Sequence, residues 1–456
     1  MKYKSIVWLF AAACLTACNS NDLLLDAESF NEDNASIVPC VSNVPIRFAP
    51  VDLQDVTGKS IQAAASRRSN GTGSYSSDSV GIFCLAKYSI EGLTEIHTPT
   101  WSGIAKKPVG INEYSIWIKN ELASLQYKDN SDAGKLVWDK DYKDETGFYP
   151  NNDWFAYGFV AYYPHTQNIV YTKGTVTALV KVDGDDDVCY AMAKKPKTVT
   201  GDSQLDRSGF SRSYYAGLSH DSGVDEWIYP RFEFTRMMSK LVFTIRMKEE
   251  PKYNLHVEKI ELENFPCIMK VGLASRTSGD MKLNIDSNPK KRFIRNKADL
   301  DEQKEKMRAC YKMDSLQIEE NFPELKSPLG HFELREENGE PISNQRNDDG
   351  SYKYNLSTQR IEIGGGMLIP PVYTDHSKST LQVYVTLADD AGNTYRNRKS
   401  ISVPPPQGGY VAGYAYPVPL ALTCPIPSPS DGEITDWEVE ELGSINETLT
   451  QWERLP

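Results

Sequence analysis

The pattern of apolar and polar residues predicts β-strands along most of this chain. Residues 240–247 (KLVFTIRM) and 381–387 (LQVYVTL) alternate, so that every second side chain would face one buried side of a sheet. Residues 154–163 (WFAYGFVAYY) form an aromatic-rich run of the kind that fills core strands. The segment 389–393 (DDAGN) has the composition of a hairpin turn. The pattern favours a mainly β protein built from sandwiches.

One stretch departs from this pattern. Within residues 299–313, apolar side chains recur at helical spacing among charges, which predicts a single amphipathic helix inserted between strands. Helices do not alternate with strands elsewhere, and this argues against a parallel α/β sheet. Tyr229-Pro230 interrupts the chain before the strand at 240–247. We therefore expect two domains of similar length, residues 44–232 and 233–437, with the helix in the second.

The N-terminus has the features of an export signal. Two lysines precede a short apolar run at residues 6–13, which is too short to span a bilayer as a helix. The run ends in Leu15-Thr16-Ala17-Cys18, which resembles the lipobox of bacterial lipoproteins. We expect residues 1–17 to be a signal peptide, Cys18 to carry the lipid, and residues 18–43 to form a tether. An ordinary signal peptide that contains a cysteine is the alternative.

Charge and cysteine content exclude several classes of protein. The chain carries 62 acidic and 50 basic residues, and removal of the signal peptide with its two lysines leaves a formal charge of −14. Such a charge does not attract nucleic acid. The cysteines after Cys18 have no metal-finger spacing, and buried free thiols are favoured over disulfides. These cysteines are Cys40, Cys84, Cys189, Cys267, Cys310 and Cys424.

No arrangement of residues indicates catalysis. The six histidines are scattered, with no HExxH motif, and no Gly-x-Ser-x-Gly elbow occurs. The acidic segment at residues 183–187 (DGDDD) departs from the EF-hand order, because Val188 stands where glycine is needed. A solvated acidic turn is favoured there over a bound cation. We therefore expect a protein that is not an enzyme and has no cofactor and no metal site.

Several short segments follow the lipobox in order along the chain. They are residues 44–49 (VPIRFA), 78–83 (DSVGIF), 162–164 (YYP), 234–241 (FTRMMSKL), 367–371 (MLIPP), 413–416 (GYAY) and 434–437 (ITDW). In this order, the segments resemble the fimbrillin superfamily of Bacteroidetes, the type V pilus subunits and related lipoproteins. One departure is Arg236, where the family often has histidine.

This resemblance implies two tandem transthyretin-like β-sandwich domains, in a palmitate-carrying lipoprotein exposed on the cell outer membrane or in a fimbria with a role in cell adhesion. It implies that an Arg-specific protease releases the first strand, and that other fimbrial subunits assemble by strand exchange. The exchanged strand would contain Val44, Ile46 and Phe48. The candidate cleavage sites are Arg47, Arg67 and Arg68, although solvated arginines without this role are the alternative.

Two further points remain open at this stage. Residues 438–456 extend past the last family-like segment, and could be a donor segment, an added strand or a tail. A surface glycan-binding lipoprotein is the alternative function, because exposed aromatic rings stack on sugars, and a host protein or glycan is a further possible partner. The tryptophans that could form such a platform are Trp101, Trp117, Trp138, Trp154 and Trp227.

Overall fold

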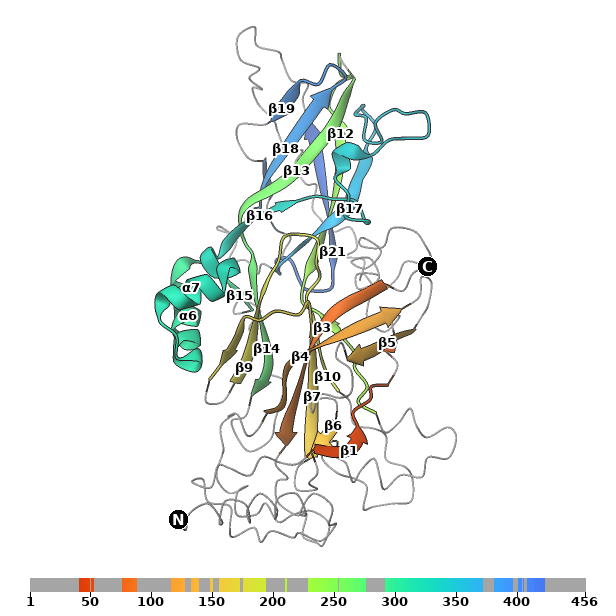
Figure 1. The fold of residues 1–456 in the computed structure, drawn as a ribbon. Helices are drawn as coiled ribbons and strands as arrows, with labels where there is room; N and C mark the ends of the chain where they lie inside the picture. Colours follow the sequence, from red (N-terminus) through yellow and green to blue (C-terminus); the bar gives the residue numbers. More distant parts are fainter. Residues whose placement is uncertain are drawn as a thin grey trace, which may run out of the picture.

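The structure is a computed structural model, and within its described residues the protein is mainly β (Figure 1). Cys18, Arg67, Arg68 and residues 438–456 lie outside these residues. The described residues are 41–49, 51–52, 76–87, 116–127, 133–138, 148–150, 156–172, 175–193, 210, 229–252, 254–275, 292–371, 381–396, 401–403, 405 and 408–422.

A seven-stranded antiparallel sheet forms one layer of what we call the first unit. Its strand order is β11-β10-β7-β3-β4-β5-β2, and a separate pair, β1 with β6, lies outside this order. The strands are β1 (Val41–Pro45), β2 (Val51–Asp52), β3 (Ser76–Lys87), β4 (Ile116–Tyr127), β5 (Ala133–Trp138), β6 (Phe148–Pro150), β7 (Ala156–Tyr163), β10 (Cys189–Met192) and β11 (Thr235–Arg236).

A four-stranded sheet forms the other layer of the first unit, and it corrects the expected domain division. Its order is β15 (Phe293–Ile294), β14 (Ile268–Ser275), β9 (Thr175–Lys181) and β8 (Ile169–Tyr171). Strands β14 and β15 follow the boundary expected at residue 232, yet β14 pairs antiparallel with β9. The expected division at residue 232 therefore does not follow the sheets. The strand that ends at Pro266 belongs to the second unit, and the chain returns through Cys267 to the first unit, where it forms β14.

The helices follow this crossing and pack on the first unit. The expected helix is present as α6 (Lys297–Tyr311), and α7 (Ser315–Asn321) and the 3-10 helix η6 (Pro323–Lys326) come after it. The Asn296 side chain caps α6 by accepting from the Asp299 N–H at 3.0 Å. The Tyr311 hydroxyl donates to the Ile169 carbonyl in β8 at 2.8 Å, so the helical insertion lies on the first unit and not on the second as expected.

The second unit contains a three-stranded and a five-stranded sheet. Strand β21 runs parallel to β12, and the other paired strands are antiparallel. The three-stranded sheet has the order β17 (Ile361–Ile369), β12 (Ser239–Met247), β21 (Ala415–Leu422). The five-stranded sheet contains β16 (Leu329–Glu333), β13 (Leu255–Pro266), β18 (Leu381–Asp389), β19 (Thr394–Arg396) and β20 (Ile401–Val403), and the 3-10 helix η7 (Ile342–Asn344) lies between β16 and β17 in sequence.

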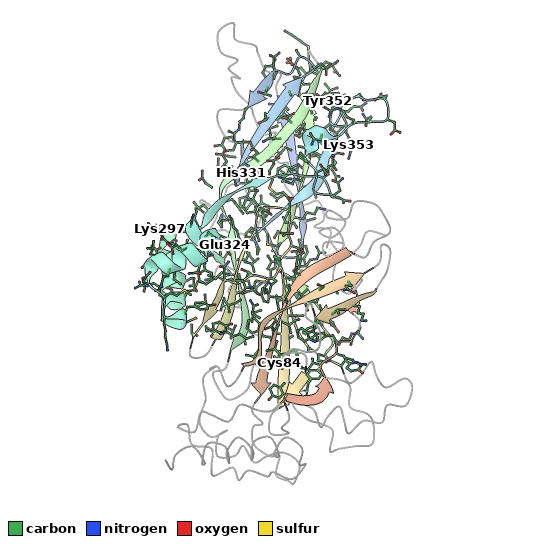
Figure 2. The ribbon with its side chains drawn as sticks, viewed as in Figure 1. Cys84, Lys297, Glu324, His331, Tyr352 and Lys353 are labelled. Carbon is green, nitrogen blue, oxygen red and sulfur yellow. The ribbon has the colours of Figure 1, made fainter. Side chains whose placement is uncertain are left out.

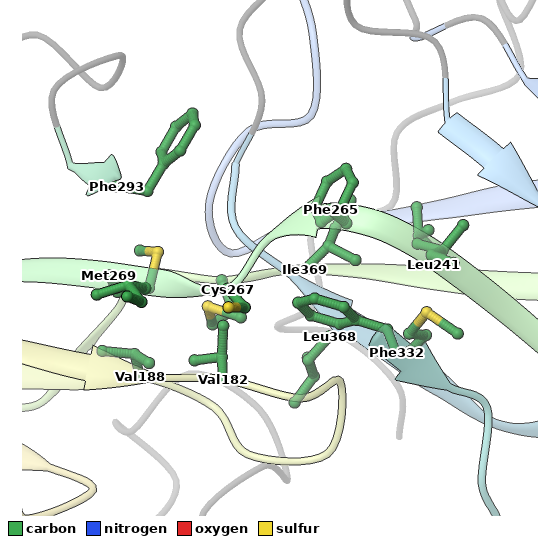
Figure 3. Packing of buried hydrophobic residues seen from close by; sticks show 14 of the residues in the cluster. Val182, Val188, Leu241, Phe265, Cys267, Met269, Phe293, Phe332, Leu368 and Ile369 are labelled. Atoms are coloured by element: carbon green, nitrogen blue, oxygen red, sulfur yellow. The ribbon is translucent and has the colours of Figure 1, made fainter. Parts of the chain in front are cut away.

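Alternating side chains confirm the expected strands and bury both faces of the seven-stranded sheet. Every second residue of β12 is buried, as its sequence predicts. In β3 and β7, Phe83 and Val160 belong to the core shared with the four-stranded sheet, whereas Ile82 and Phe159 belong to a second core. The first core continues into the second unit, and Figure 3 shows its packed side chains around the crossing at Cys267.

The described cysteines are free thiols, as expected for Cys84, Cys189, Cys267 and Cys310. Burial raises the pKa of the Cys84 and Cys267 thiols, so both remain protonated at neutral pH and are poor nucleophiles. Cys40 and Cys424 lie outside the described residues. Neither described α-helix is long and apolar enough to cross a membrane.

Candidate functional site

The N-terminal segment, residues 41–49, contains the predicted exchangeable strand, residues 44–49. The observed strand β1 begins inside the expected tether and ends at Pro45, where it pairs with Phe148 of β6. Residues 46–49 have no strand partner, in contrast to the expected strand 44–49. Instead, the indole N–H of Trp138 donates to the Ile46 carbonyl at 3.0 Å. The Ala49 N–H donates to the Pro230 carbonyl at 3.1 Å.

Side chains of this segment fill the second core of the seven-stranded sheet. Ile46 is completely buried in that core, and Phe48 packs against it. The centroid of the Phe48 ring lies 4.9 Å from that of Trp138, 5.6 Å from that of Phe232 and 6.1 Å from that of Phe159. A segment with apolar residues two positions apart therefore covers a surface made by residues from elsewhere in the chain.

The predicted processing residues are only partly described. Arg47 is exposed, between the buried Ile46 and the half-buried Phe48. The backbone of Val44 lies in β1, and its side chain is outside the described set. The structure thus joins Ile46 and Phe48 in one core and leaves Arg47 in solvent.

The acidic turn at residues 183–187 is held by cations of the protein. The Asp187 carboxylate lies 3.3 Å from the Arg236 guanidinium, and both side chains are buried. Asp185 lies 3.2 Å from Arg335 of the second unit. The Gly184 carbonyl accepts from the Leu368 N–H at 2.8 Å. The turn therefore connects the two units through an ion pair and a hydrogen bond. The sequence predicted only a solvated acidic turn here.

A conformational requirement supports this close approach. Gly184 has a φ of +107°, which glycine adopts readily and other residues rarely adopt. A Cβ atom at this position would lie 3.2 Å from the Phe332 ring of β16. Glycine thus permits both the backbone conformation of the turn and its packing on the second unit.

Carboxylates and an imidazole also gather on the second unit. Glu261 of β13 and His331 and Glu333 of β16 offer oxygen and nitrogen atoms within 4.8 Å of one another. Figure 2 labels His331 on the second unit. The Arg396 guanidinium lies 3.3 Å from Glu261, and the Lys259 ammonium lies 3.8 Å from Glu333. These cations make the cluster an ion-pair network, in which the carboxylate charge is already balanced.

The aromatic residues expected for a glycan platform are only partly described. Trp138 packs on Phe48 and donates its indole N–H to Ile46, so it serves the core of the first unit. Trp117 lies in β4, with its side chain outside the described set. Trp101, Trp154 and Trp227 also lie outside the described residues.

No family model matches the sequence, and the comparison with curated proteins found no match. The chain is similar to solved structures of fimbrial and cell adhesion proteins. A candidate cell adhesion protein from Bacteroides fragilis shares 11% identity over 87% of this chain and 97% of that chain, with a TM-score of 0.35. A fimbrial protein from Bacteroides vulgatus shares 12% identity over 75% of this chain and 88% of that chain, with a TM-score of 0.31.

The fimbrial anchor protein Mfa2 from Porphyromonas gingivalis shares 8% identity over 72% of this chain and 76% of that chain, with a TM-score of 0.20. Scores of this size carry no argument about fold or activity.

Proposed function

We propose that this chain is a fimbrillin-like structural subunit of a cell-surface fimbria, with a structural and not an enzymatic role. The observation that carries the proposal is the burial of Ile46, from the N-terminal segment, in the second core, with Phe48 packed against that core. The order of fimbrillin-like segments in the sequence supports it. We further propose that its two units correspond to the transthyretin-like β-sandwiches that the resemblance implies, with the crossing at Cys267 between them.

Loss of the N-terminal segment would uncover a specific apolar surface. The rings of Trp138, Phe159 and Phe232 would lose their contacts with Phe48, and the indole N–H of Trp138 would lose its acceptor. Exposure of a buried isoleucine alone costs about 1.5–3 kcal/mol. A strand from another subunit with apolar residues two positions apart would restore these contacts. Strand exchange would thus join neighbouring subunits.

Proteolysis is the proposed trigger. Arg47 is exposed, but its neighbours Ile46 and Phe48 are held in the core, which hinders entry of residues 46–48 into a protease cleft. Arg67 and Arg68 are therefore the preferred sites in this proposal, for a trypsin-like Arg-specific protease. The cut would separate the N-terminal segment from the rest of the chain and leave it held by non-covalent contacts.

Export completes the proposal. Cys18 would carry the lipid that leads the precursor to the cell outer membrane, where the chain becomes surface-exposed and contributes to cell adhesion. Fatty-acid labelling of cells should mark the wild-type chain and leave Cys18→Ala unlabelled. Equal label in both would contradict lipidation at Cys18.

Determination of the N-terminus of the chain in purified surface filaments tests the function directly. We expect a start immediately after Arg47, Arg67 or Arg68. The proposed function would be overturned if the chain is absent from filaments, remains monomeric on the surface and still begins at Cys18. In that case, binding of the purified chain to a glycan array would favour the glycan-binding alternative.

A further inference from the structure

The last described strand, β21, pairs on one side only among the described residues. It runs parallel to β12 at the end of the three-stranded sheet (Figure 1). The Lys240 N–H donates to the Tyr414 carbonyl at 2.9 Å, and the Lys248 N–H donates to the Leu422 carbonyl at 2.8 Å. These two bonds lie at the two ends of the strand, and they establish which of its residues point their backbone groups toward β12.

Peptide groups of a strand serve its two neighbours alternately. In a parallel pair, the N–H and C=O of one residue point to the same side, and those of the next residue point to the other side. Tyr414 and Leu422 face β12, and so do the even-numbered residues between them. The odd-numbered residues therefore face the outer edge, and they are Ala415, Pro417, Pro419 and Ala421.

Two of these four outward positions lack an N–H, because they are prolines. Pro417 is exposed and Pro419 is half-buried, so their rings stand at the accessible part of the strand. Proline removes a ladder donor, and its ring occupies the place where a partner carbonyl would approach. An incoming strand would meet outward carbonyls there without the matching donors.

The opposite edge of the same sheet is closed by other means. Gly365 of β17 donates its N–H to the Arg335 carbonyl at 2.8 Å, and Leu368 of β17 donates to the Gly184 carbonyl at 2.8 Å. Carbonyl groups of neighbouring segments thus accept hydrogen bonds from outward N–H groups of β17. Within the described residues, the outer edge of β21 has no such hydrogen-bonded neighbour.

We infer that Pro417 and Pro419 close the outer edge of β21 to β-strand addition, so that a second copy of this chain cannot pair there. Exposed edges otherwise recruit strands of other chains, and proline is one way in which proteins prevent this. The closure does not depend on the proposed fimbrial function. Where that function holds, the prolines confine strand addition to the first unit and prevent branching at the second.

Restoring the two donors tests the inference. The variant Pro417→Thr/Pro419→Thr adds two N–H groups without adding apolar surface, and threonine suits a strand. Pro251→Thr, in the turn after β12, is the matched control, because it replaces a proline away from a strand edge. Sedimentation velocity of the full chain in detergent, over a roughly hundredfold range of concentration, would measure self-association.

We expect the wild type and Pro251→Thr to sediment alike, and the double variant to self-associate at least roughly tenfold more tightly, as two net hydrogen bonds would allow. Equal association of all three chains would overturn the inference. Because residues 41–49 are unchanged in every variant, that failure would leave strand exchange at the first unit untouched.

Hydrogen exchange keeps the inference testable if the double variant folds poorly. In the wild type, the Ala415 N–H faces the outer edge and should exchange fast, whereas the inward N–H groups of Tyr416 and Val418 should be protected. Protection of Ala415 comparable to that of Val418 would show that the edge is already paired, and would contradict a role for the prolines in closing it.

Discussion

The guanidinium of Arg236 lies 3.3 Å from the carboxylate of Asp187, and both side chains are almost completely buried. Arg236 ends β11, separated by two residues from the first strand of the second unit, and Asp187 ends the acidic turn before β10. The same turn contacts Arg335 and Leu368 of the second unit. A buried ion pair thus stands where the chain passes from one unit to the other.

Removing one partner of this pair should be more damaging than removing both. Arg236→Met leaves the Asp187 carboxylate buried beside an apolar side chain, at a cost of about 3–5 kcal/mol in the free energy of unfolding. Urea denaturation would measure this cost. The double variant Asp187→Leu/Arg236→Met buries no charge and should be the more stable of the two. If the single variant is as stable as the double, the pair does not act as a buried charge pair.

The N-terminal segment should contribute to stability through its buried side chains. Ile46→Ala removes a fully buried side chain and should lower the free energy of unfolding by about 2–4 kcal/mol. The neighbouring variant Arg47→Ala changes an exposed residue, and its effect should stay within about 0.5 kcal/mol. Both values come from urea denaturation. Equal small effects would mean that the segment does not support the second core.

Strands were predictable where one face of a sheet is buried, because burial imposes the alternation seen in β12 and β18. The domain division was not predictable from the sequence. Strands β13 and β14 are separated by Cys267 alone, so they form one nearly continuous extended stretch. Only the pairing of β14 with β9 shows that the chain has changed units. A local sequence pattern indicates which residues are buried, but it does not indicate which strand they pack against.

The candidate site was predictable to a similar extent. The structure places Ile46 in the second core and packs Phe48 against it, within the segment where the sequence predicts a strand. The prediction was a paired strand, but the backbone of residues 46–49 is held by the Trp138 side chain and the Pro230 carbonyl. Arg236 was missed as a buried residue because arginine is mostly exposed, and its partner Asp187 is distant in sequence.

A fragment that ends at residue 232 should not fold independently. The fragment lacks β14, so β9 has no strand to pair with on that side of the four-stranded sheet. The first core also loses the buried side chains of β14. We expect circular dichroism and urea titration of this fragment to show no cooperative unfolding transition, in contrast to the full chain. A cooperative transition comparable to that of the full chain would restore the domain boundary expected from the sequence.

Stability should decrease in mild acid because of His256. Its ring stacks on Tyr352, with centroids 3.4 Å apart, and burial lowers the pKa of His256 below its usual value of 6.5. The folded protein therefore binds this proton less tightly than the unfolded chain. Its contribution to stability is complete above pH 6.5, and is lost as the pH falls from there toward the folded-state pKa.

Urea midpoints at about pH 7.5 and about pH 5 would measure the effect, since these values bracket the titration of a histidine. His256→Gln should reduce the difference between the two midpoints. An identical difference in both proteins would exclude His256 as its source.

The most direct test of strand exchange is limited digestion of the purified precursor with an Arg-specific protease, followed by measurement of oligomer size. The wild type should be cut first at Arg47, Arg67 or Arg68 and then form higher oligomers. The uncleavable control Arg47→Gln/Arg67→Gln/Arg68→Gln should remain monomeric. Phe48→Ala should assemble faster after the cut, because its segment is held less tightly. A cut wild-type protein that stays monomeric at high concentration would contradict strand exchange.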